Sequence, residues 1–237
     1  MQKVDAVSNA HRKSNFFLGN QNLKKPGTVT NYTQEQILEY AKCASDPIYF
    51  AKTYIKIIHV DLGLIPFHMW DFQEEFMKVL WKERHVVGRM SRQIGKSTCV
   101  VSYFLWMALF HEHQTIGILA NKADLAQELL AKIRLAYEHI PLWIQQGIVS
   151  WNKRSIELEN GCRIIAAATT SSAIRGYSFT AILLDEFAHV PKNIADDFFA
   201  SVFPTISSGK TTKLFIISTP LGLNHYYHHW RNAREIA

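Results

Sequence analysis

The sequence has few cysteines and no long hydrophobic run. Its three cysteines, Cys43, Cys99 and Cys162, stand far apart and form no CxxC pair, so buried reduced thiols are expected instead of a disulfide framework. The longest apolar run, from Cys99 to Phe110, is too short to span a bilayer, and no stretch resembles a signal peptide. These absences argue against a secreted or membrane-spanning protein and favour a cytoplasmic one.

Charged residues are also scarce, at 19% against 48% hydrophobic residues, which excludes an intrinsically disordered chain. A chain of 237 residues can bury a full core, and one α/β domain is expected. The net charge of +6 favours polyanionic partners. One basic group near the N-terminus is either a solvated tail or a DNA contact; it comprises His11, Arg12, Lys13, Lys24 and Lys25.

Regular structure is expected only after residue 30, because residues 1–30 are polar and lack sustained periodicity. Thr33 with Gln36 predicts a helix start, and Asp46-Pro47 begins a second helix over DPIYFAKTYIKI. Apolar strands then alternate with helices, which predicts a mostly parallel sheet covered on both faces. The strands are expected at 85–90, 115–120, 155–168 (a hairpin turning at Asn160-Gly161), 181–186 and 213–219, with helices at 97–110 and 122–139.

The stretch RMSRQIGKST nearly spells a phosphate-binding loop between a strand and a helix. Gly95, Lys96 and Ser97 close the pattern, but Met90 occupies the position of the opening glycine. In such loops, backbone N–H groups and a helix N-terminus converge on an anion, and the lysine adds a positive charge. Ser97 is the residue type that binds Mg²⁺ there.

Two further elements follow the loop in the chain. The apolar strand AILLDE ends in Asp185 and Glu186, which predicts a Mg²⁺ ligand and a carboxylate that polarises the attacking water. Ser218 and Thr219 directly follow another buried strand, where polar side chains face the ligand crevice of an α/β sheet. A helix cap would explain the acids alone, and turn chemistry would explain Ser-Thr-Pro alone. Together with the loop they indicate a nucleotide site.

With these residues placed, the chain resembles the ATPase domain of the large terminase subunit, the DNA-packaging motor of tailed bacteriophages, and most closely the myovirus type. The carrying stretches are DFQEEF (71–76), SRQIGKST (91–98), TTSSAIRGYSFTAILLDEFAHV (169–190) and STPLGLNHYYHHW (218–230). Large terminases characteristically lack the first loop glycine, so the resemblance also accounts for Met90. It implies a P-loop NTPase fold of the ASCE type, with a mostly parallel sheet flanked by helices and preceded by an N-terminal helical or irregular arm.

The resemblance implies a role for each matching residue. Gln73 corresponds to the adenine-contacting glutamine, Arg92 and Lys96 to the phosphate-contacting pair, and Glu186 to the catalytic carboxylate. Ser97 and Asp185 correspond to the Mg²⁺ ligands, and Ser218 and Thr219 to the motif that couples hydrolysis to movement. The implied nucleotide contacts are Gln73, Ser91, Arg92, Gln93, Ile94, Gly95, Lys96, Ser97 and Thr98.

Arg175 lies 186 − 175 = 11 positions before Glu186, where related motors carry an arginine finger that acts on a neighbouring subunit. A salt bridge within the same subunit is the alternative, and Arg92 could then supply the stabilising guanidinium in cis.

Acidic residues are nearly absent after Asp197, where Glu235 is the only one. The C-terminal nuclease domain of full-length large terminases needs clustered Asp and Glu for its metal ions, so this domain is expected to be absent. The predicted organisation is a basic polar arm at 1–30 and an ATPase domain at 31–237.

The resemblance implies ATP with Mg²⁺, double-stranded DNA, the phage portal protein and the small terminase subunit as partners, and no membrane. It further implies a homo-oligomeric ring, expected to be a pentamer, on the capsid in the host cytoplasm, or a monomer in isolation. A helicase-like ATPase and a nucleotide-binding assembly scaffold without turnover remain the alternative functions.

Two other motifs invite a metal interpretation. His225 and His229 are spaced i, i+4 on a predicted helix, but no carboxylate or third ligand is near in sequence, so a structural or surface role is predicted. Asp196 and Asp197 are predicted to lie on a solvated helical face.

Overall fold

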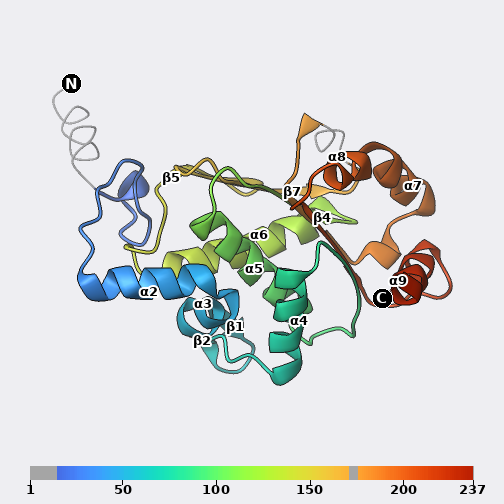
Figure 1. Cartoon of the computed structure of the whole chain (residues 1–237), viewed down its shortest axis with the longest axis horizontal. Helices are drawn as coiled ribbons and strands as arrows, with labels where there is room; N and C mark the ends of the chain where they lie inside the picture. The colour runs from blue at the N-terminus through green and yellow to red at the C-terminus, as the bar shows by residue number, and fades with distance from the viewer. Residues whose placement is uncertain (1–14, 171–175, 237) are drawn as a thin grey trace.

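The computed structural model describes residues 15–170 and 176–236 (Figure 1). The helices of this part are η1 (Phe17–Gly19), α2 (Gln34–Ser45), α3 (Pro47–Tyr54), α4 (Asp71–Lys82), α5 (Lys96–Phe110), α6 (Ala123–His139), η3 (Phe187–His189), α7 (Lys192–Ser201), α8 (Phe203–Ser207) and α9 (His225–Ile236). The strands are β1 (Lys56–His59), β2 (Gly63–Pro66), β3 (His85–Arg89), β4 (Thr115–Ala120), β5 (Ile148–Trp151), β6 (Ser155–Leu158), β7 (Arg163–Ala168), β8 (Ala181–Asp185) and β9 (Lys213–Ser218). Among the described residues, no helix has both the length and the apolar character that a bilayer span needs.

Seven strands form one sheet in the order β3-β9-β8-β4-β7-β6-β5. All neighbours from β3 to β7 are parallel, whereas β6 and β5 pair in antiparallel fashion. The predicted mostly parallel sheet is therefore confirmed, as is the hairpin at Asn160-Gly161, where Gly161 adopts a φ of 79°. The described part of the chain forms a layered α/β fold, in which helices flank this sheet (Figure 1).

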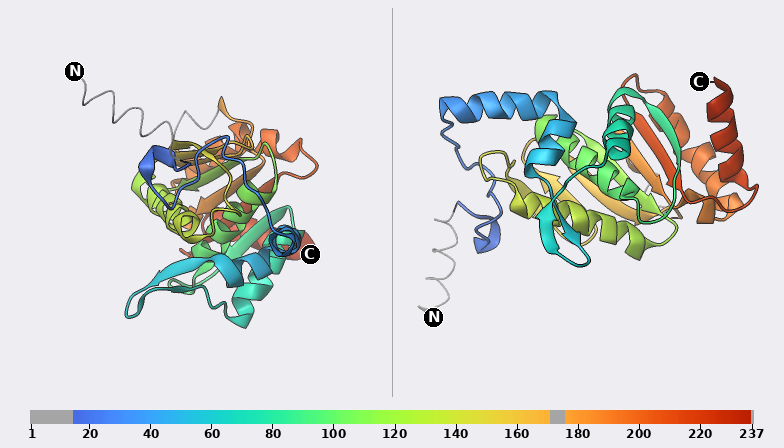
Figure 2. Two further views of the ribbon diagram at one scale, coloured as in Figure 1. Left: turned by 90° about the vertical axis from the view of Figure 1, so that its left-hand side faces the viewer. Right: turned by 90° about the horizontal axis from the view of Figure 1, so that it is seen from below.

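The two faces of the sheet carry separate cores because side chains alternate along each strand. Leu183 and Phe215 point into the larger core, which α2 to α6 cover. Leu184 and Ile216 point into the smaller core, which η3, α7, α8 and the start of α9 cover. Figure 2 shows α7 to α9 gathered at one end of the sheet. Helix α5 is buried along almost its whole length, which explains why its sequence is apolar all round.

Helices cover both faces of the sheet, as expected, and the cover is thinner over β7. Over β7, the outward-facing side chains of Ile165 and Ala167 are half-buried, because the helices of the smaller core lie over the β8–β9 side of the sheet.

The second predicted helix is too long at its C-terminal end. Helix α3 stops at Tyr54, and the β-branched residues Ile57 and Ile58 enter β1 instead. β1 pairs with β2 in a separate two-stranded hairpin that the sequence did not reveal, with Ile57 opposite Ile65. This hairpin projects from the body of the domain (Figure 2).

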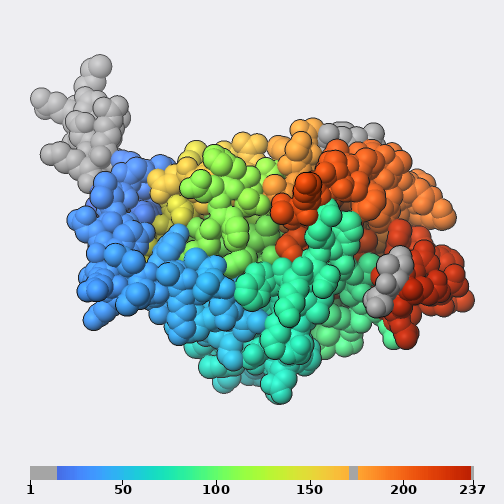
Figure 3. Space-filling model, viewed as in Figure 1, coloured from blue at the N-terminus to red at the C-terminus, as the bar shows by residue number. Residues whose placement is uncertain are grey.

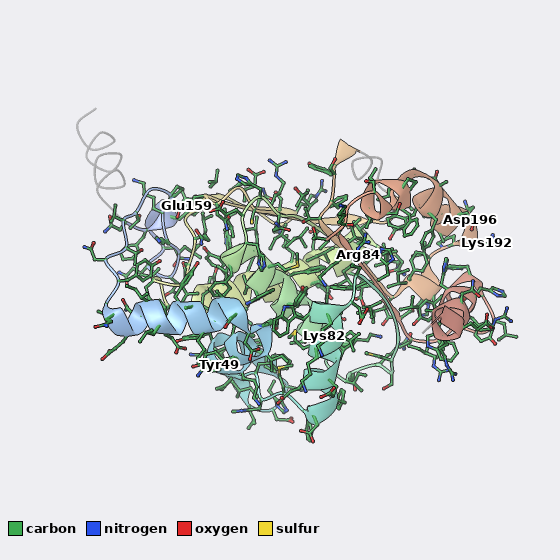
Figure 4. All side chains as sticks on the ribbon, in the orientation of Figure 1. Tyr49, Lys82, Arg84, Glu159, Lys192 and Asp196 are labelled. Atoms are coloured by element: carbon green, nitrogen blue, oxygen red, sulfur yellow. The ribbon has the colours of Figure 1, made fainter. Side chains whose placement is uncertain are left out.

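The segment at 15–30 packs against the antiparallel end of the sheet (Figure 3). The Lys24 N–H donates to Gln145 Oε1 at 3.0 Å, and its C=O accepts from the Ile148 N–H at 2.9 Å. Glu159 accepts from the Gly27 N–H at 2.8 Å and lies beside this segment in Figure 4. The expectation of either a solvated tail or a DNA contact is thus wrong for Lys24, which is only 8% exposed. His11, Arg12 and Lys13 lie outside the described residues.

Candidate nucleotide site

The predicted phosphate loop joins β3 to α5. Gly95 has a φ of 77° and Gln93 a φ of 62°, so the loop runs through the left-handed region twice before Lys96 begins the helix. The positive φ favours glycine at position 95, and a Cβ atom there would lie 2.4 Å from Gln73 Nε2, so it would displace the Gln73 amide. The loop places the N-terminus of a long helix at its centre, as an anion site requires.

The strand order brings the three predicted elements to one edge of the sheet. β9 lies between β3 and β8, with Ser218 opposite Arg89 and Ile217 opposite Asp185. Because the three strands are parallel, the loop, the acid pair and the Ser218-Thr219 pair all follow carboxyl ends at the same edge. Asp185 and Ser218 are buried there, as is Lys96.

Lys96 and Glu186 form an ion pair across this edge. Lys96 Nζ donates to Glu186 Oε1 at 2.8 Å, and the two side chains are 7% and 23% exposed. Burial opposes ionisation of Glu186, but the hydrogen bonds from Lys96 and Thr219 outweigh it and hold its pKa below the ordinary value. Glu186 is therefore ionised at neutral pH.

The other oxygen of Glu186 is held by the Ser218-Thr219 pair. Glu186 Oε2 accepts from the Thr219 N–H at 3.2 Å and from Thr219 Oγ1 at 2.9 Å, and Ser218 Oγ lies 3.3 Å away. The His189 ring also reaches this cluster, with Nε2 3.3 Å from Thr219 Oγ1. Glu186 itself adopts a φ of 49°, which costs a non-glycine residue on the order of 1–2 kcal/mol.

Asp185 and Ser97 face each other beside this pair. Ser97 Oγ lies 3.4 Å from Asp185 Oδ1. Burial raises the pKa of Asp185, with the negative charge of Glu186 adding to the effect. A hydroxyl and a carboxylate are the hard oxygen donors that Mg²⁺ prefers, and a cation would relieve the cost of burying the Asp185 charge. These residues therefore fit a magnesium ion. No cluster of three or more His, Cys, Asp or Glu side chains that could hold a metal occurs in the described ranges, so further ligands would be water and phosphate oxygens.

Gln73 contacts the phosphate loop itself. Its Oε1 accepts from the Trp70 N–H and its Nε2 donates to the Ile94 C=O, both at 2.9 Å. A cavity of about 800 Å³ opens beside Gln73 between the loop and the β1–β2 hairpin. Its lining is mostly apolar and comprises Ile57, His59, Leu62, Ile65, Phe67, His68, Met69, Trp70, Phe72, Gln73, Gln93, Ile94, Gly95 and Thr98. A planar base fits such a site, and the hairpin that forms one wall was missed from the sequence.

The remaining predicted residues differ in what the structure says of them. Ser91 and Arg92 lie exposed on the loop, as Gln93 does. Arg175 lies outside the described residues, so its role stays a prediction.

The predicted structural role of the histidines is confirmed. His225 Nε2 lies 3.2 Å from the Phe187 C=O, and the His229 ring stacks on Phe199 with centroids 4.4 Å apart. Asp196 forms an exposed ion pair with Lys192 on α7, in agreement with a solvated helical face (Figure 4).

Comparison with known proteins places these features in a family. The family model described as the N-terminal domain of the T4-like-virus type of terminase large subunit matches residues 88–236, from the loop strand through α9. The solved structure of the HK97 bacteriophage large terminase is similar, with a TM-score of 0.68 and 18% identity over 81% of this chain. The large terminase of a thermophilic bacteriophage has a TM-score of 0.55 and 13% identity over 70% of this chain. The same thermophilic-phage protein has been solved in complex with ATP-γ-S, with a TM-score of 0.53 and 14% identity.

The present chain spans only part of these proteins. It covers 41% of the HK97 chain and 43% of the thermophilic-phage chain. At these identities the likeness shows the fold, which is that of the terminase ATPase domain and agrees with the predicted P-loop NTPase class.

Proposed function

Because this chain belongs to the terminase large subunit family, as the N-terminal domain of the T4-like-virus type, we propose that it is a Mg²⁺-dependent ATPase that drives double-stranded viral DNA into a procapsid. The observation that carries the proposal is the convergence of Lys96, Asp185 and Glu186 at the edge where the strands β3, β9 and β8 end.

Phosphate binding would use the loop and Lys96. The N-terminus of α5 and the backbone N–H groups of the loop would attract the phosphates. The Lys96 ammonium would then leave Glu186 and donate a hydrogen bond to a phosphate oxygen. The position of Lys96 supports this exchange, because the residue begins α5 and its Nζ lies 2.8 Å from Glu186 Oε1.

Water activation would fall to Glu186. Once Lys96 turns to the phosphates, Oε1 becomes free to accept a hydrogen bond from water while Thr219 still holds Oε2. The hydrogen bonds from Thr219, which also lower the pKa of Glu186, remain after Lys96 leaves and favour the ionised carboxylate in this role. Ser97 and Asp185 would hold the Mg²⁺ ion, which supplies charge stabilisation on the phosphoryl oxygens when bound.

The base of the nucleotide would occupy the cavity beside Gln73. The thermophilic-phage relative has been solved in complex with ATP-γ-S, which supports an adenine nucleotide here. Trp70 and Phe72, 69% and 50% exposed, stand at this cavity and offer aromatic surface to a base.

The partners and the assembly belong to the same proposal. The basic pI of about 9.2 suits contact with DNA phosphates, without base readout. The portal protein, the small terminase subunit and a homo-oligomeric ring in the host cytoplasm follow from the family. In such a ring Arg175 would act on the γ-phosphate of a neighbour.

The test is ATP turnover in Lys96→Ala and Glu186→Ala, with Lys192→Ala as a surface control. We expect both site variants to lose hydrolysis and the control to keep it. Near-normal turnover in Lys96→Ala contradicts the site, and DNA-dependent strand separation in place of translocation favours a helicase. Nucleotide binding by the unchanged chain without any turnover favours a scaffold.

The position of Arg175 is tested by mixing subunits. Arg175→Ala subunits that keep Glu186 are combined with Glu186→Ala subunits that keep Arg175. Partial recovery of hydrolysis is expected if the arginine acts in trans. No recovery at a concentration where the mixed oligomer forms assigns the stabilising guanidinium to a cis residue such as Arg92.

A further inference from the structure

Three consecutive residues before and within α9 each hydrogen-bond a backbone carbonyl of the site. Asn224 Nδ2 donates to the Ala188 C=O at 2.9 Å, and the Tyr226 hydroxyl donates to the Gly88 C=O at 2.7 Å. His225 Nε2 lies 3.2 Å from the Phe187 C=O. Because a carbonyl only accepts, this nitrogen carries the proton.

Two of these carbonyls belong to the turn that directly follows Glu186. Phe187 and Ala188 lie in η3, and Glu186 precedes them in the left-handed conformation with a φ of 49° and a ψ of 42°. A non-glycine residue keeps such a conformation only where the surrounding contacts enforce it. Asn224 and His225 supply contacts of this kind from outside the turn.

Other contacts strengthen the same connection. The Phe187 and His225 rings meet edge to face with centroids 5.1 Å apart. The Ala188 N–H donates to Ser218 Oγ at 3.0 Å, so the turn is also tied to the strand end beside Glu186. Tyr226 is 2% exposed and fixes the same helix to β3, the strand that leads into the phosphate loop.

We propose that Asn224 and His225 are positioning residues for Glu186, which hold the η3 turn and thereby aim the carboxylate at the phosphate loop. This inference rests on the proposed ATPase function. The segment NHY at 224–226 thus links the acid-bearing turn to the loop-bearing strand through one helix.

Asn224 allows the positioning role to be separated from helix capping. Its Oδ1 accepts from the Tyr227 N–H at 3.3 Å, so Asn224 also caps the start of α9. Asn224→Ser and Asn224→Asp both retain a good capping oxygen. Serine is too short to reach the Ala188 C=O, and aspartate has no donor for it. Asn232→Ser, in the exposed part of the same helix, is the matched control.

The first measurement is steady-state hydrolysis with nucleotide affinity determined separately. We expect kcat to fall about 10- to 100-fold in both Asn224 variants, the scale of a small misplacement of a catalytic group. The Kd for a non-hydrolysable ATP analogue should stay within about twofold, because Lys96 and the loop are untouched. His225→Ala should behave likewise, and His225→Gln, whose amide can donate to the Phe187 C=O, should recover part of the rate.

The second measurement does not depend on activity. Amide hydrogen exchange of residues 186–190 in the nucleotide-free full chain should become at least about tenfold faster in Asn224→Ser and stay unchanged in Asn232→Ser. Unchanged exchange and unchanged kcat in the Asn224 variants overturn the proposal. So does a loss of kcat together with equal loss of nucleotide binding and of exchange protection throughout α9, which identifies a merely structural role. If the unaltered chain does not hydrolyse ATP, the proposed function fails, and the exchange comparison still decides whether the turn is held from α9.

Discussion

Replacing Glu186 by glutamine should strengthen ATP binding while it slows hydrolysis strongly. In the structure the carboxylate holds the Lys96 ammonium at 2.8 Å, so ATP must compete with Glu186 for this lysine. Glutamine offers a neutral oxygen of the same shape. The amide oxygen still accepts from the Lys96 ammonium but lacks the negative charge, and the attraction of such a partly exposed ion pair contributes about 1 kcal/mol. The competition therefore weakens by about 1 kcal/mol, which corresponds to about fivefold tighter binding.

The assay is calorimetric titration of a non-hydrolysable ATP analogue with Mg²⁺, combined with phosphate release from ATP. Hydrolysis should fall at least about 10²-fold, because the amide cannot polarise water as a carboxylate does. Glu157→Gln is the matched control. It removes one carboxylate from the ion pair with Arg163, at 2.9 Å, near the antiparallel end of the sheet. This control should change neither quantity.

Two results would refute this reasoning. Binding that weakens about fivefold or more in folded Glu186→Gln protein would mean that the carboxylate holds the loop open for nucleotide. Hydrolysis near the unaltered rate would remove Glu186 from the chemistry.

The remaining predictions concern the loop, a helix cap and the thiols. Gly95→Ala should weaken nucleotide binding in the same titration, because a φ of 77° disfavours alanine and the new Cβ displaces Gln73; unaltered affinity contradicts the loop geometry. Asp46→Ala should lower the free energy of unfolding in urea by about 0.5–2 kcal/mol, since its Oδ1 caps two N–H groups of α3, whereas Asp46→Asn should be nearly neutral. Ellman's reagent should label no thiol of the native protein quickly at about pH 8, and should label three thiols in guanidinium. All three cysteines, Cys43, Cys99 and Cys162, are buried, and burial raises the pKa of Cys43 and of Cys99 to about 12.

The parts of the fold that are local in sequence could be predicted. The buried strands expected at 115–120 and 213–219 are continuous apolar runs, and the structure places β4 and β9 there within one residue. The phosphate loop and the acid pair were recognisable because each directly follows such a strand. The family match at 88–236 covers both.

Features that depend on tertiary contacts could not be predicted. The strand order places β9 between β3 and β8, although β9 comes last in the chain. The β1–β2 hairpin is held together by backbone pairing, and apolar residues such as Val60, 98% exposed, face solvent in it. Its sequence therefore lacks the alternation of apolar and polar residues that indicates a half-buried strand. Lys24 is buried by a partner 121 positions away, Gln145, and no local pattern announces such a contact.

The missed site residues share the same cause. His189 and Asn224 act on the backbone or on Thr219, contacts that span about 30 to 36 positions of sequence. The sequence predicts a structural or surface role for the histidines of NHYYHHW, but it does not indicate that His225 contacts the turn after Glu186. The left-handed backbone conformation of Glu186 cannot be inferred from the local sequence Asp185-Glu186-Phe187.

The place of β3 in the sheet has a consequence for handling shorter versions of the chain. β3 is an edge strand, and an uncovered strand edge pairs readily with another chain. The Tyr226 hydroxyl donates a hydrogen bond to the Gly88 carbonyl of this strand, and α9 packs against β3. A version that ends before Asn224 lacks α9. It would therefore leave the Gly88 carbonyl without this partner and expose the apolar edge strand β3 to solvent. We expect such a truncation to self-associate in light scattering where the longer chain does not, so α9 protects the solubility of the domain at the strand that bears its phosphate loop.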